Sequence, residues 1–333
     1  MITTSREPRI LILPASYGAD GRVIGGGERY AYEYARALAN LTPVTLALFG
    51  GRPESQEEGP LRVRTLPGNV TRPFFWARRT TRAELLEHDV FHAMVFPTPA
   101  TDYLLLLGAW ARKPVVLTDV GGGGRCLSGF LRRWGRAWDL NRRADGLALL
   151  SPYSARFFAH WSQPRAILLG GVRQAFEPQP SRPEGFALFV GRLLPHKGVL
   201  PLIEAMPPDV PLKIVGESYD PAYDAALRRA AKHRQVEFAG RVTDQELDDL
   251  YARASVVVQP SLPLPGEDKS ELLGLAVIEA MAREKPVVVT AAGSLPDLVV
   301  PGVTGFRSPV ASEPATSSHP GGTIPTPPIP GPS

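Results

Sequence analysis

Cysteine is almost absent from this sequence of 333 residues, which contains a single one, Cys126. An internal disulfide framework and a metal site built from several cysteines are therefore excluded, and a lone thiol fits a reducing cytosol. Long apolar runs are also missing, because the stretch around Leu104–Leu107 is far too short to span a bilayer. Three charged residues precede a short apolar run in the first 14 residues, so we expect no signal peptide there.

Several binding motifs are absent as well. No segment has the GxxxxGK[ST] spacing of a phosphate-binding P-loop. The segment Gly25–Glu28 is rich in glycine but lacks the spacing of a dinucleotide fingerprint and lies eleven residues beyond Pro14. The basic residues come without a recognisable nucleic-acid-reading module, so we predict no nucleic-acid partner.

The sequence does contain enough apolar material for two folded cores. Hydrophobic residues make up 44% of the chain and charged residues 21%, close to the average for globular proteins. At roughly 150 residues per domain, the length predicts two domains. Residues 1–172 hold 22 basic and 14 acidic residues (net +8), whereas residues 173–333 hold 15 and 19 (net −4). This asymmetry indicates two different surfaces and an anionic partner for the first domain.

Short apolar runs alternate with helix-period segments, which predicts parallel sheets covered on both faces. The fold class we expect is α/β, with two facing, doubly wound, Rossmann-like domains and a cleft at the carboxyl ends of their strands. The expected strands are 10–13, 44–49, 90–95, 115–118, 146–150, 187–190, 212–215, 236–238, 255–259 and 287–290. The expected helices include 28–41, 99–112, 200–206, 222–232, 245–254 and 273–283. The predicted boundaries are 1–172 for the first domain, 173–185 for a proline-interrupted linker, 186–308 for the second domain and 309–333 for a tail.

Proline is about twice as frequent as its usual 5%, with 35 residues, and eight of them fall within 309–333. That segment has no aromatic residue and no periodicity. It cannot bury enough surface to offset the entropy of ordering, so we expect it to be disordered.

The loop 191–198 follows an expected buried strand and precedes an expected helix. Its two cations, Arg192 and Lys197, suit a diphosphate, because arginine forms forked hydrogen bonds and lysine acts as a point charge. The alternative interpretation is a solvated loop whose cations bind nothing.

A second pattern is the segment 271–279, where Glu271 precedes an expected helix, Gly274 lies near its first turn and Glu279 lies inside it. Free backbone N–H groups at such a helix start can receive a phosphate. The two carboxylates can accept hydrogen bonds from sugar hydroxyls. Alternatively, Glu271 only stabilises the helix dipole and Glu279 is an exposed helical acid.

These segments resemble the retaining GT-B glycosyltransferases of family 4. The resemblance covers about residues 8–307 and is specific in the second half. The matching segments there are 189–192, 196–198, 236–240, 259–261, 271–282, 286–289 and 301–305, and the looser ones in the first half are 25–28 and 89–92.

The resemblance implies roles for individual positions. Arg192 and Lys197 would hold the donor diphosphate, and Glu271 would bind the donor sugar as a catalytic residue. Glu279 would bind the nucleotide ribose. The remaining donor-side positions are Gly274 and Leu275 (backbone amides), Val242 (flanking the base) and Gly25 and Gly26 (close backbone approach). Members of the family need no metal for the diphosphate, so no cofactor and no metal site are expected.

Two departures from the family pattern bear on these expectations. His92 would be catalytic, but Met94 stands where many relatives have a second histidine, and the alternative is a structural histidine that ends a buried strand. The family-like sequence stops near Phe306, where relatives continue into further β/α units and a crossover helix. We therefore expect a chain that lacks this crossover segment and leaves apolar surface uncovered.

The function that the resemblance implies is transfer of a sugar, with retention, from a nucleotide-diphosphate sugar to a glycan, lipid or small-molecule acceptor. The alternatives are a lapsed nucleotide-sugar-binding protein and a sugar-nucleotide epimerase of the same fold. The expected location is the cytoplasm.

An aromatic and basic stretch in the first half suggests a peripheral contact with an anionic membrane, at its inner face. The apolar stripe comprises Leu127, Phe130, Leu131, Trp134 and Trp138, and the cations on the other face are Arg132, Arg133, Arg136, Arg142 and Arg143. The segment 72–79 has a similar composition. The alternative interpretation is an ordinary stripe packed on the sheet, with solvated arginines.

Overall fold

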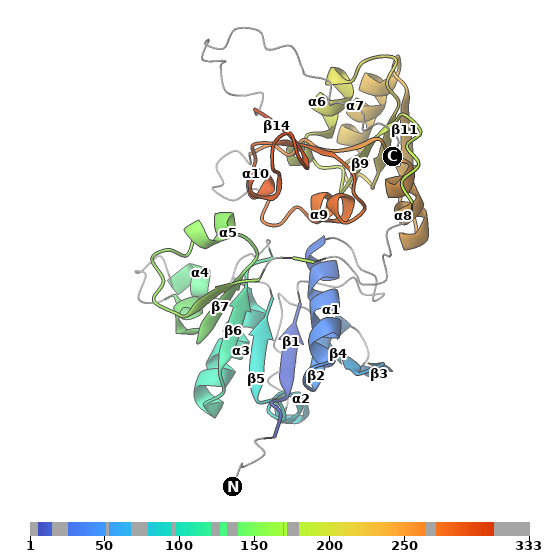
Figure 1. The fold of residues 1–333 in the computed structure, drawn as a ribbon. Coiled ribbons are helices and arrows are strands. Elements are labelled where there is room, and N and C mark those ends of the chain that lie inside the picture. Colours follow the sequence, from blue (N-terminus) through green and yellow to red (C-terminus); the bar gives the residue numbers. More distant parts are fainter. Residues whose placement is uncertain are drawn as a thin grey trace, which may run out of the picture.

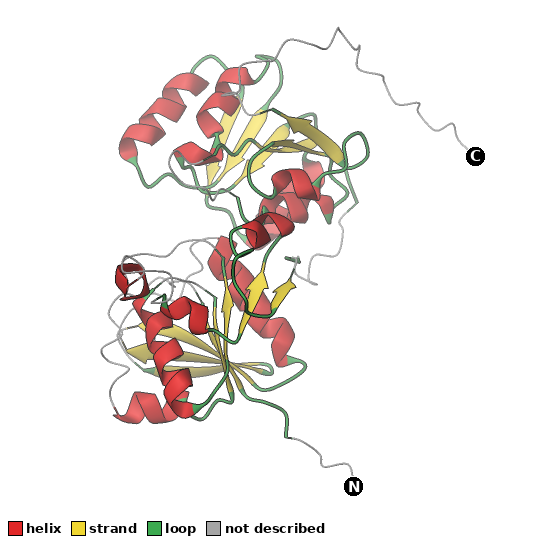
Figure 2. Cartoon of the chain, turned by 90° about the vertical axis from the view of Figure 1, so that its left-hand side faces the viewer, coloured by secondary structure: helices red, strands yellow, loops and turns green. Residues whose placement is uncertain are grey.

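The computed structural model contains two α/β domains, each built on one sheet and stacked one above the other (Figures 1 and 2). It describes residues 6–14, 26–50, 53–67, 79–94, 98–120, 127–131, 139–168, 170–171, 180–263 and 271–309. The tail expected to be disordered lies, apart from Pro309, outside the described residues. No helix among the described residues is long and apolar enough to cross a membrane.

The first sheet has eight strands in the order β3-β4-β2-β1-β5-β6-β7-β8. All neighbours are parallel except β3 and β4, which form an antiparallel pair at one edge. The strands are β1 (Ile10–Leu13), β2 (Val44–Gly50), β3 (Glu54–Glu58), β4 (Leu61–Pro67), β5 (Val90–Ala93), β6 (Val115–Thr118), β7 (Gly146–Leu149) and β8 (Arg165–Ile167). Because β1 lies in the middle and the order reverses there, the carboxyl ends of β1 and its neighbours open a crevice.

The second sheet has six strands in the order β11-β10-β9-β12-β13-β14, and all of them are parallel. The strands are β9 (Ala187–Val190), β10 (Leu212–Val215), β11 (Val236–Gly240), β12 (Val256–Gln259), β13 (Val287–Thr290) and β14 (Gly305–Ser308). The order again reverses at its centre, between β9 and β12.

Helices connect the strands and cover both sheets. In the first domain they are α1 (Gly26–Ala39), α2 (Arg79–Leu85), α3 (Pro99–Ala111), α4 (Leu127–Leu131), the 3-10 helix η4 (Leu140–Arg143) and α5 (Pro152–Arg156). In the second they are the 3-10 helix η5 (Pro195–Lys197), α6 (Val199–Ala205), α7 (Pro221–Ala231), α8 (Asp244–Arg253), α9 (Leu275–Met281) and α10 (Leu295–Leu298).

Each sheet is buried on both faces, which confirms the doubly wound architecture. Strand side chains that alternate along β1 divide between two clusters, with Leu11 and Leu13 on one side and Ile12 on the other. In β9, Leu188 belongs to one cluster and Ala187 and Phe189 belong to the other. A fully covered parallel sheet explains why these strands read as continuous apolar runs.

Candidate functional site

The loops at the carboxyl ends of the second sheet come together at the edge that faces the first domain (Figure 1). The loop after β9 reaches the loop after β12, because the backbone N–H of Leu262 donates to the carbonyl of His196 at 2.7 Å. Gly198 makes this approach possible: it has a φ of 69°, and a Cβ there would overlap the carbonyl oxygen of Pro260. A side chain at this position would therefore push the two loops apart.

Lys197 and Glu271 form an ion pair where these loops meet. Both side chains are largely buried, with 17% and 12% of their surfaces exposed. The Ser261 hydroxyl donates a second hydrogen bond to Glu271 Oε1, at 2.9 Å. The pair thus joins the loops after β9 and β12 to the segment that leads into α9.

The carboxyl group of Glu271 is held as a carboxylate. Burial alone would raise its pKa, but the charge of Lys197 and the hydrogen bonds from Lys197 and Ser261 outweigh burial and lower the pKa below its ordinary value. The group is therefore an acceptor at neutral pH, poised at the edge where ligands of such sheets bind.

The backbone of Glu271 is fixed by a loop that the sequence did not single out. Gly293 has a φ of 59°, and a Cβ there would overlap the backbone of Glu271. The next residue, Ser294, donates its N–H to the Glu271 carbonyl at 2.7 Å. The loop after β13 therefore fits closely around Glu271, and glycine is needed at position 293 to allow it.

Arg192 lies in the same loop as Lys197 but is exposed. Within the described part of the chain, its side chain forms no ion pair with a carboxylate. The two cations that the sequence predicted for a diphosphate are thus in different states: one is engaged with Glu271 and the other is open to solvent.

Gly274 precedes α9 in the left-handed conformation, with a φ of 71°. Helix α9 begins at Leu275, and a Cβ on Gly26 of α1 would lie 3.2 Å from the Leu275 side chain. Two positions predicted from distant parts of the sequence are therefore neighbours across the domain boundary. Gly25 lies outside the described residues.

Glu279 is buried inside α9, so the interpretation of an exposed helical acid is wrong. The Tyr251 hydroxyl, from α8, donates to Glu279 Oε2 at 3.0 Å. Burial raises the pKa of Glu279, although Arg29 of the first domain, the Tyr251 hydrogen bond and Arg283 act in the opposite direction. Among the described residues no hydrogen bond reaches the other oxygen, Oε1.

Arg29 connects this region to the first domain. It lies in the first turns of α1 and forms an ion pair with Asp244, the first residue of α8. The positive charge of Arg29 also lowers the pKa of Glu279, against the effect of burial. Arg29 was not predicted, although it directly follows the segment Gly25–Glu28, whose resemblance to the family could have pointed to it.

Leucines from the second domain complete a core of the first. Leu272 and Leu273 are each 7% exposed and pack in the cluster that contains Ile12 and Met94. The Ser151 hydroxyl donates to the carbonyl of Leu272 at 2.7 Å. The segment that carries Glu271 is therefore held by both domains.

His92 lies near the carboxyl end of β5 in the first sheet and is 4% exposed. One of its ring nitrogens, Nε2, lies 2.7 Å from the hydroxyl of Thr118, and Tyr34 packs edge-on against the ring. Burial lowers its pKa to about 4, so the imidazole is neutral at neutral pH. The structural interpretation accounts for all of these contacts.

Val242 lies just after β11 and packs, partly buried, against the core of the second domain. Next to it, Arg241 forms an ion pair with Glu217 at 3.5 Å, which joins the turn after β11 to the loop after β10. The turn after β11 carries Val242, the position that the resemblance placed beside the base.

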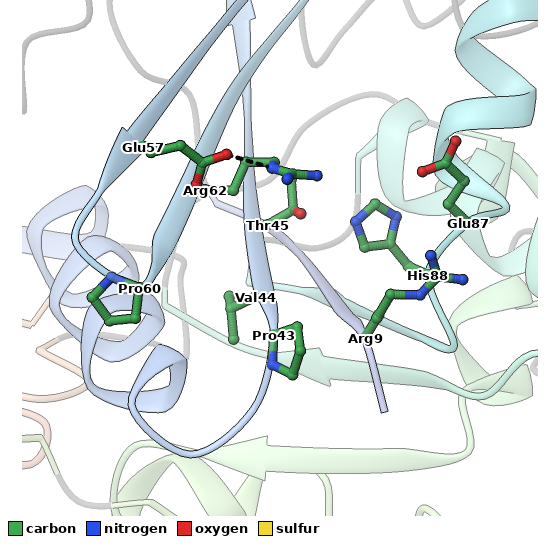
Figure 3. A pocket seen from close by; sticks show the side chains of 9 residues that line it. All are labelled: Arg9, Pro43, Val44, Thr45, Glu57, Pro60, Arg62, Glu87 and His88. Carbon is green, nitrogen blue, oxygen red and sulfur yellow. Dashed lines mark hydrogen bonds and ion pairs between the residues drawn. The ribbon is translucent and has the colours of Figure 1, made fainter. Parts of the chain in front are cut away.

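A hollow of about 210 Å³ lies elsewhere, at the amino ends of the first sheet's strands (Figure 3). Arg9 precedes β1, Val44 begins β2, and Arg62 in β4 pairs with Glu57 at 2.8 Å. His88 closes the opposite side. Because ligands of such sheets bind at the carboxyl ends, this hollow is separate from the predicted site.

The architecture and the placement of these loops define a class of protein: two facing Rossmann-like domains with polar side chains at the carboxyl edges, which is the GT-B arrangement. Two family models match nearly the whole described chain, Glycosyltransferase Family 4 over residues 24–168 and Glycosyl transferases group 1 over residues 173–316. The chain belongs to the GT-B glycosyltransferases of family 4.

Two curated relatives each match about a third of the chain. An uncharacterized glycosyltransferase from Methanocaldococcus jannaschii is 32% identical over 124 residues, which are 36% of this chain and 33% of the relative. A GDP-mannose-dependent monoacylated alpha-(1-6)-phosphatidylinositol monomannoside mannosyltransferase from Corynebacterium glutamicum is 36% identical over 118 residues, 33% of this chain and 30% of the relative. The matched part thus spans about a third of the length of these relatives.

Solved structures confirm the fold over most of the chain. A glycosyltransferase from Rickettsia africae has a TM-score of 0.70 at 18% identity, with 92% of this chain and 86% of that chain covered. The Anabaena protein HepE, solved in complex with UDP-glucose, has a TM-score of 0.66 at 21% identity, with 91% and 86% covered.

Proposed function

We propose that this protein transfers a sugar, with retention of anomeric configuration, from a nucleotide-diphosphate sugar to a glycan, lipid or small-molecule acceptor. The observation that carries the proposal is the buried Lys197–Glu271 pair, with its hydrogen bond from Ser261, at the carboxyl edge that faces the first domain. Family membership supports the reaction class. We expect the transferred group to be a hexosyl group. The cytoplasm is the compartment we expect, as the single cysteine suggests.

In this proposal the two cations bind the donor diphosphate. The Lys197 ammonium has three N–H donors, so it can keep Glu271 and still donate to a phosphate oxygen. Arg192 is exposed at the mouth of the same loop and supplies a forked donor to the other phosphate. Two fixed positive groups stabilise the charge that grows on the leaving diphosphate, so the reaction needs no metal at this point.

The two carboxylates recognise hydroxyl groups. Glu271 is ionised, and it accepts hydrogen bonds from the transferred sugar next to the reacting carbon. Glu279 has one oxygen engaged by Tyr251 and accepts a ribose hydroxyl on the other. Backbone amides near Gly274 and Leu275 face the donor, Val242 flanks the base, and the glycines at 25 and 26 let the first domain approach.

The resemblance gives His92 a catalytic role, and in this proposal the buried side chain acts indirectly, by fixing the carboxyl end of β5 through Thr118. Its neutral imidazole is a hydrogen-bond partner for a hydroxyl and does not supply a charge. Replacing His92 is therefore expected to weaken turnover far less than replacing Glu271.

The test is a thermal-shift screen of the full chain with UDP-, GDP- and ADP-sugars, followed by mass spectrometry of the product. A donor at about 100 times its dissociation constant should stabilise the protein by roughly 2.7 kcal/mol. Glu271→Gln should lower turnover at least a hundredfold. The matched control is Glu237→Gln, because Glu237 also pairs with a lysine of this domain, at 2.9 Å, but lies on an outer strand with 60% of its side chain exposed.

Three results would contradict the proposal. One is the absence of a thermal shift with every donor. Another is equal turnover in Glu271→Gln and Glu237→Gln. The third is a shift without any product, which would leave a nucleotide-sugar-binding protein in place of a transferase.

A further inference from the structure

Helix α3 presents an uncharged face to solvent. Its only charged residue, Asp102, is 3% exposed, whereas Leu106 and Trp110 are 45% and 70% exposed. These two residues are four positions apart, so they lie on the same side of the helix. Buried leucines on the other side already anchor the helix to the sheet, so nothing in the packing of the domain requires apolar groups on this face.

Helix α4 packs against α3 and continues the apolar surface. Leu127 is 46% exposed and Phe130 is 56% exposed, whereas Leu131 packs against the core of the first domain. The predicted apolar stripe therefore has two kinds of member in α4. Leu131 packs on the domain core, whereas Leu127 and Phe130 are exposed to solvent. Trp134, Trp138 and three of the arginines predicted beside them lie outside the described residues.

Cations surround this face. The guanidinium of Arg82, from α2, lies 5.9 Å from the centre of the Trp110 ring. Arg112, exposed, follows the end of α3, and Arg143, also exposed, lies in η4, which contacts both α3 and α4. Exposed aromatic and aliphatic groups ringed by arginines are complementary to a lipid surface with anionic headgroups. A protein partner would not require this basic rim.

We propose that the face formed by Leu106, Trp110, Leu127 and Phe130 docks the protein on an anionic membrane. The four side chains enter the interface between headgroups and acyl chains, and Arg82, Arg112 and Arg143 pair with the headgroups. The contact is independent of the donor site, because α3 covers the sheet on a side that carries none of the proposed donor-binding residues.

The experiment is co-sedimentation of the full chain with vesicles of phosphatidylcholine alone or with about 30 mol% of anionic phosphatidylglycerol. We expect binding to the anionic vesicles, falling with salt. Leu106→Ser with Trp110→Ser should weaken it at least tenfold, because two exposed apolar side chains no longer transfer into the lipid. Arg82→Gln with Arg112→Gln should weaken binding to the anionic vesicles more than tenfold, and binding to pure phosphatidylcholine should not change.

The matched control is Phe306→Ser, since Phe306 is 59% exposed but belongs to the second sheet. It should bind vesicles like the wild type. All the substituted side chains are solvent-exposed, so circular dichroism should show unchanged folding.

No sedimentation of the wild type with anionic vesicles would overturn the proposal, as would binding that the Leu106 and Trp110 substitutions leave intact. A dimer detected by sedimentation velocity without lipid, and abolished by Trp110→Ser, would also overturn it in favour of self-association. Neither outcome touches the donor screen, so the proposed function is tested separately.

Discussion

The two domains share one architecture but treat their charged side chains in opposite ways. At the carboxyl edge of the second domain, Lys197 and Glu271 form a largely buried pair. A second buried pair of this domain, Arg283 with Asp248, joins the end of α9 to α8, and the Arg283 guanidinium lies over the ring of Tyr251. At the corresponding edge of the first domain, the buried titratable side chain that the sequence singled out is a neutral histidine. Most arginines of the first half that the structure describes are exposed.

This difference indicates a division of labour. A buried, paired charge is costly to assemble, and its desolvation is offset only by good geometry and further hydrogen bonds. The second domain buries such a pair at the edge where we propose that the charged donor binds. On the side that faces the second domain, the first domain contributes the neutral His92, a close backbone approach at Gly26 and one cation, Arg29, which pairs with Asp244. Most of its described arginines are exposed, where they can meet an anionic partner.

The largest effect should come from breaking the buried pair. Lys197→Ala leaves Glu271 without its positive partner in a site that is mostly closed to water, and should cost about 3–5 kcal/mol of unfolding free energy in urea titrations. Lys197→Ala combined with Glu271→Gln should recover part of that loss. Lys213→Ala is the control, because its partner Glu237 is 60% exposed, and should cost under ~1 kcal/mol. Equal losses in the two single variants would remove the contrast between the sites.

A smaller effect, with a distinct pH dependence, should come from His92. Burial lowers its pKa from 6.5 to about 4. The folded protein therefore binds fewer protons than the unfolded chain in that range, so stability should fall as the pH drops from 6.5 towards 4, by ~3 kcal/mol in total. His92→Gln can keep a hydrogen bond to Thr118 and should make the loss of stability between pH 6.5 and 5 less steep in urea unfolding. The slope that remains comes in part from His88, whose pKa burial also lowers. His160→Gln, at an exposed histidine, should leave the pH dependence as it is; a wild-type profile already flat over this range would show that His92 is not buried.

The smallest effect should come from the ion pair that joins the domains. Arg29 and Asp244 are 22% and 46% exposed, so solvent screens their attraction. A double-mutant cycle with Arg29→Ala and Asp244→Ala should give a coupling of about 0.2–1 kcal/mol. A coupling well above this range would mean that the first domain, like the second, uses strong charge pairing.

The parallel core could be predicted from the sequence because its strands are buried on both faces. Every strand predicted in the second half appears, within a residue or two. Three of the four strands that were missed lie at sheet edges and are mostly exposed. Strand β3 has no apolar residue, β8 is exposed throughout, and β14 buries only its first residue. Strand β4 was missed although Leu61 and Val63 alternate with arginines, a pattern that predicts a half-buried strand.

The site residues that belong to a sequence motif could be predicted. The residues that join the site only through long-range packing could not. Spacing identified Lys197 and Glu271 but could not show that they touch, since 74 positions separate them. Ser261, Tyr251 and Gly293 contribute only through tertiary contacts with the two glutamates. The roles proposed for these residues, and the domain boundaries, remain predictions for the experiments above.

The insertion of Leu272 and Leu273 into the first domain has a mechanical consequence. These leucines follow directly after Glu271. A rotation of one domain against the other therefore shifts the segment that carries this carboxylate. If Glu271 binds the transferred sugar as proposed, its position relative to that sugar would change with the angle between the domains. A second domain produced alone would lose this coupling between the domains. It would also expose two leucines to solvent and so be prone to aggregation.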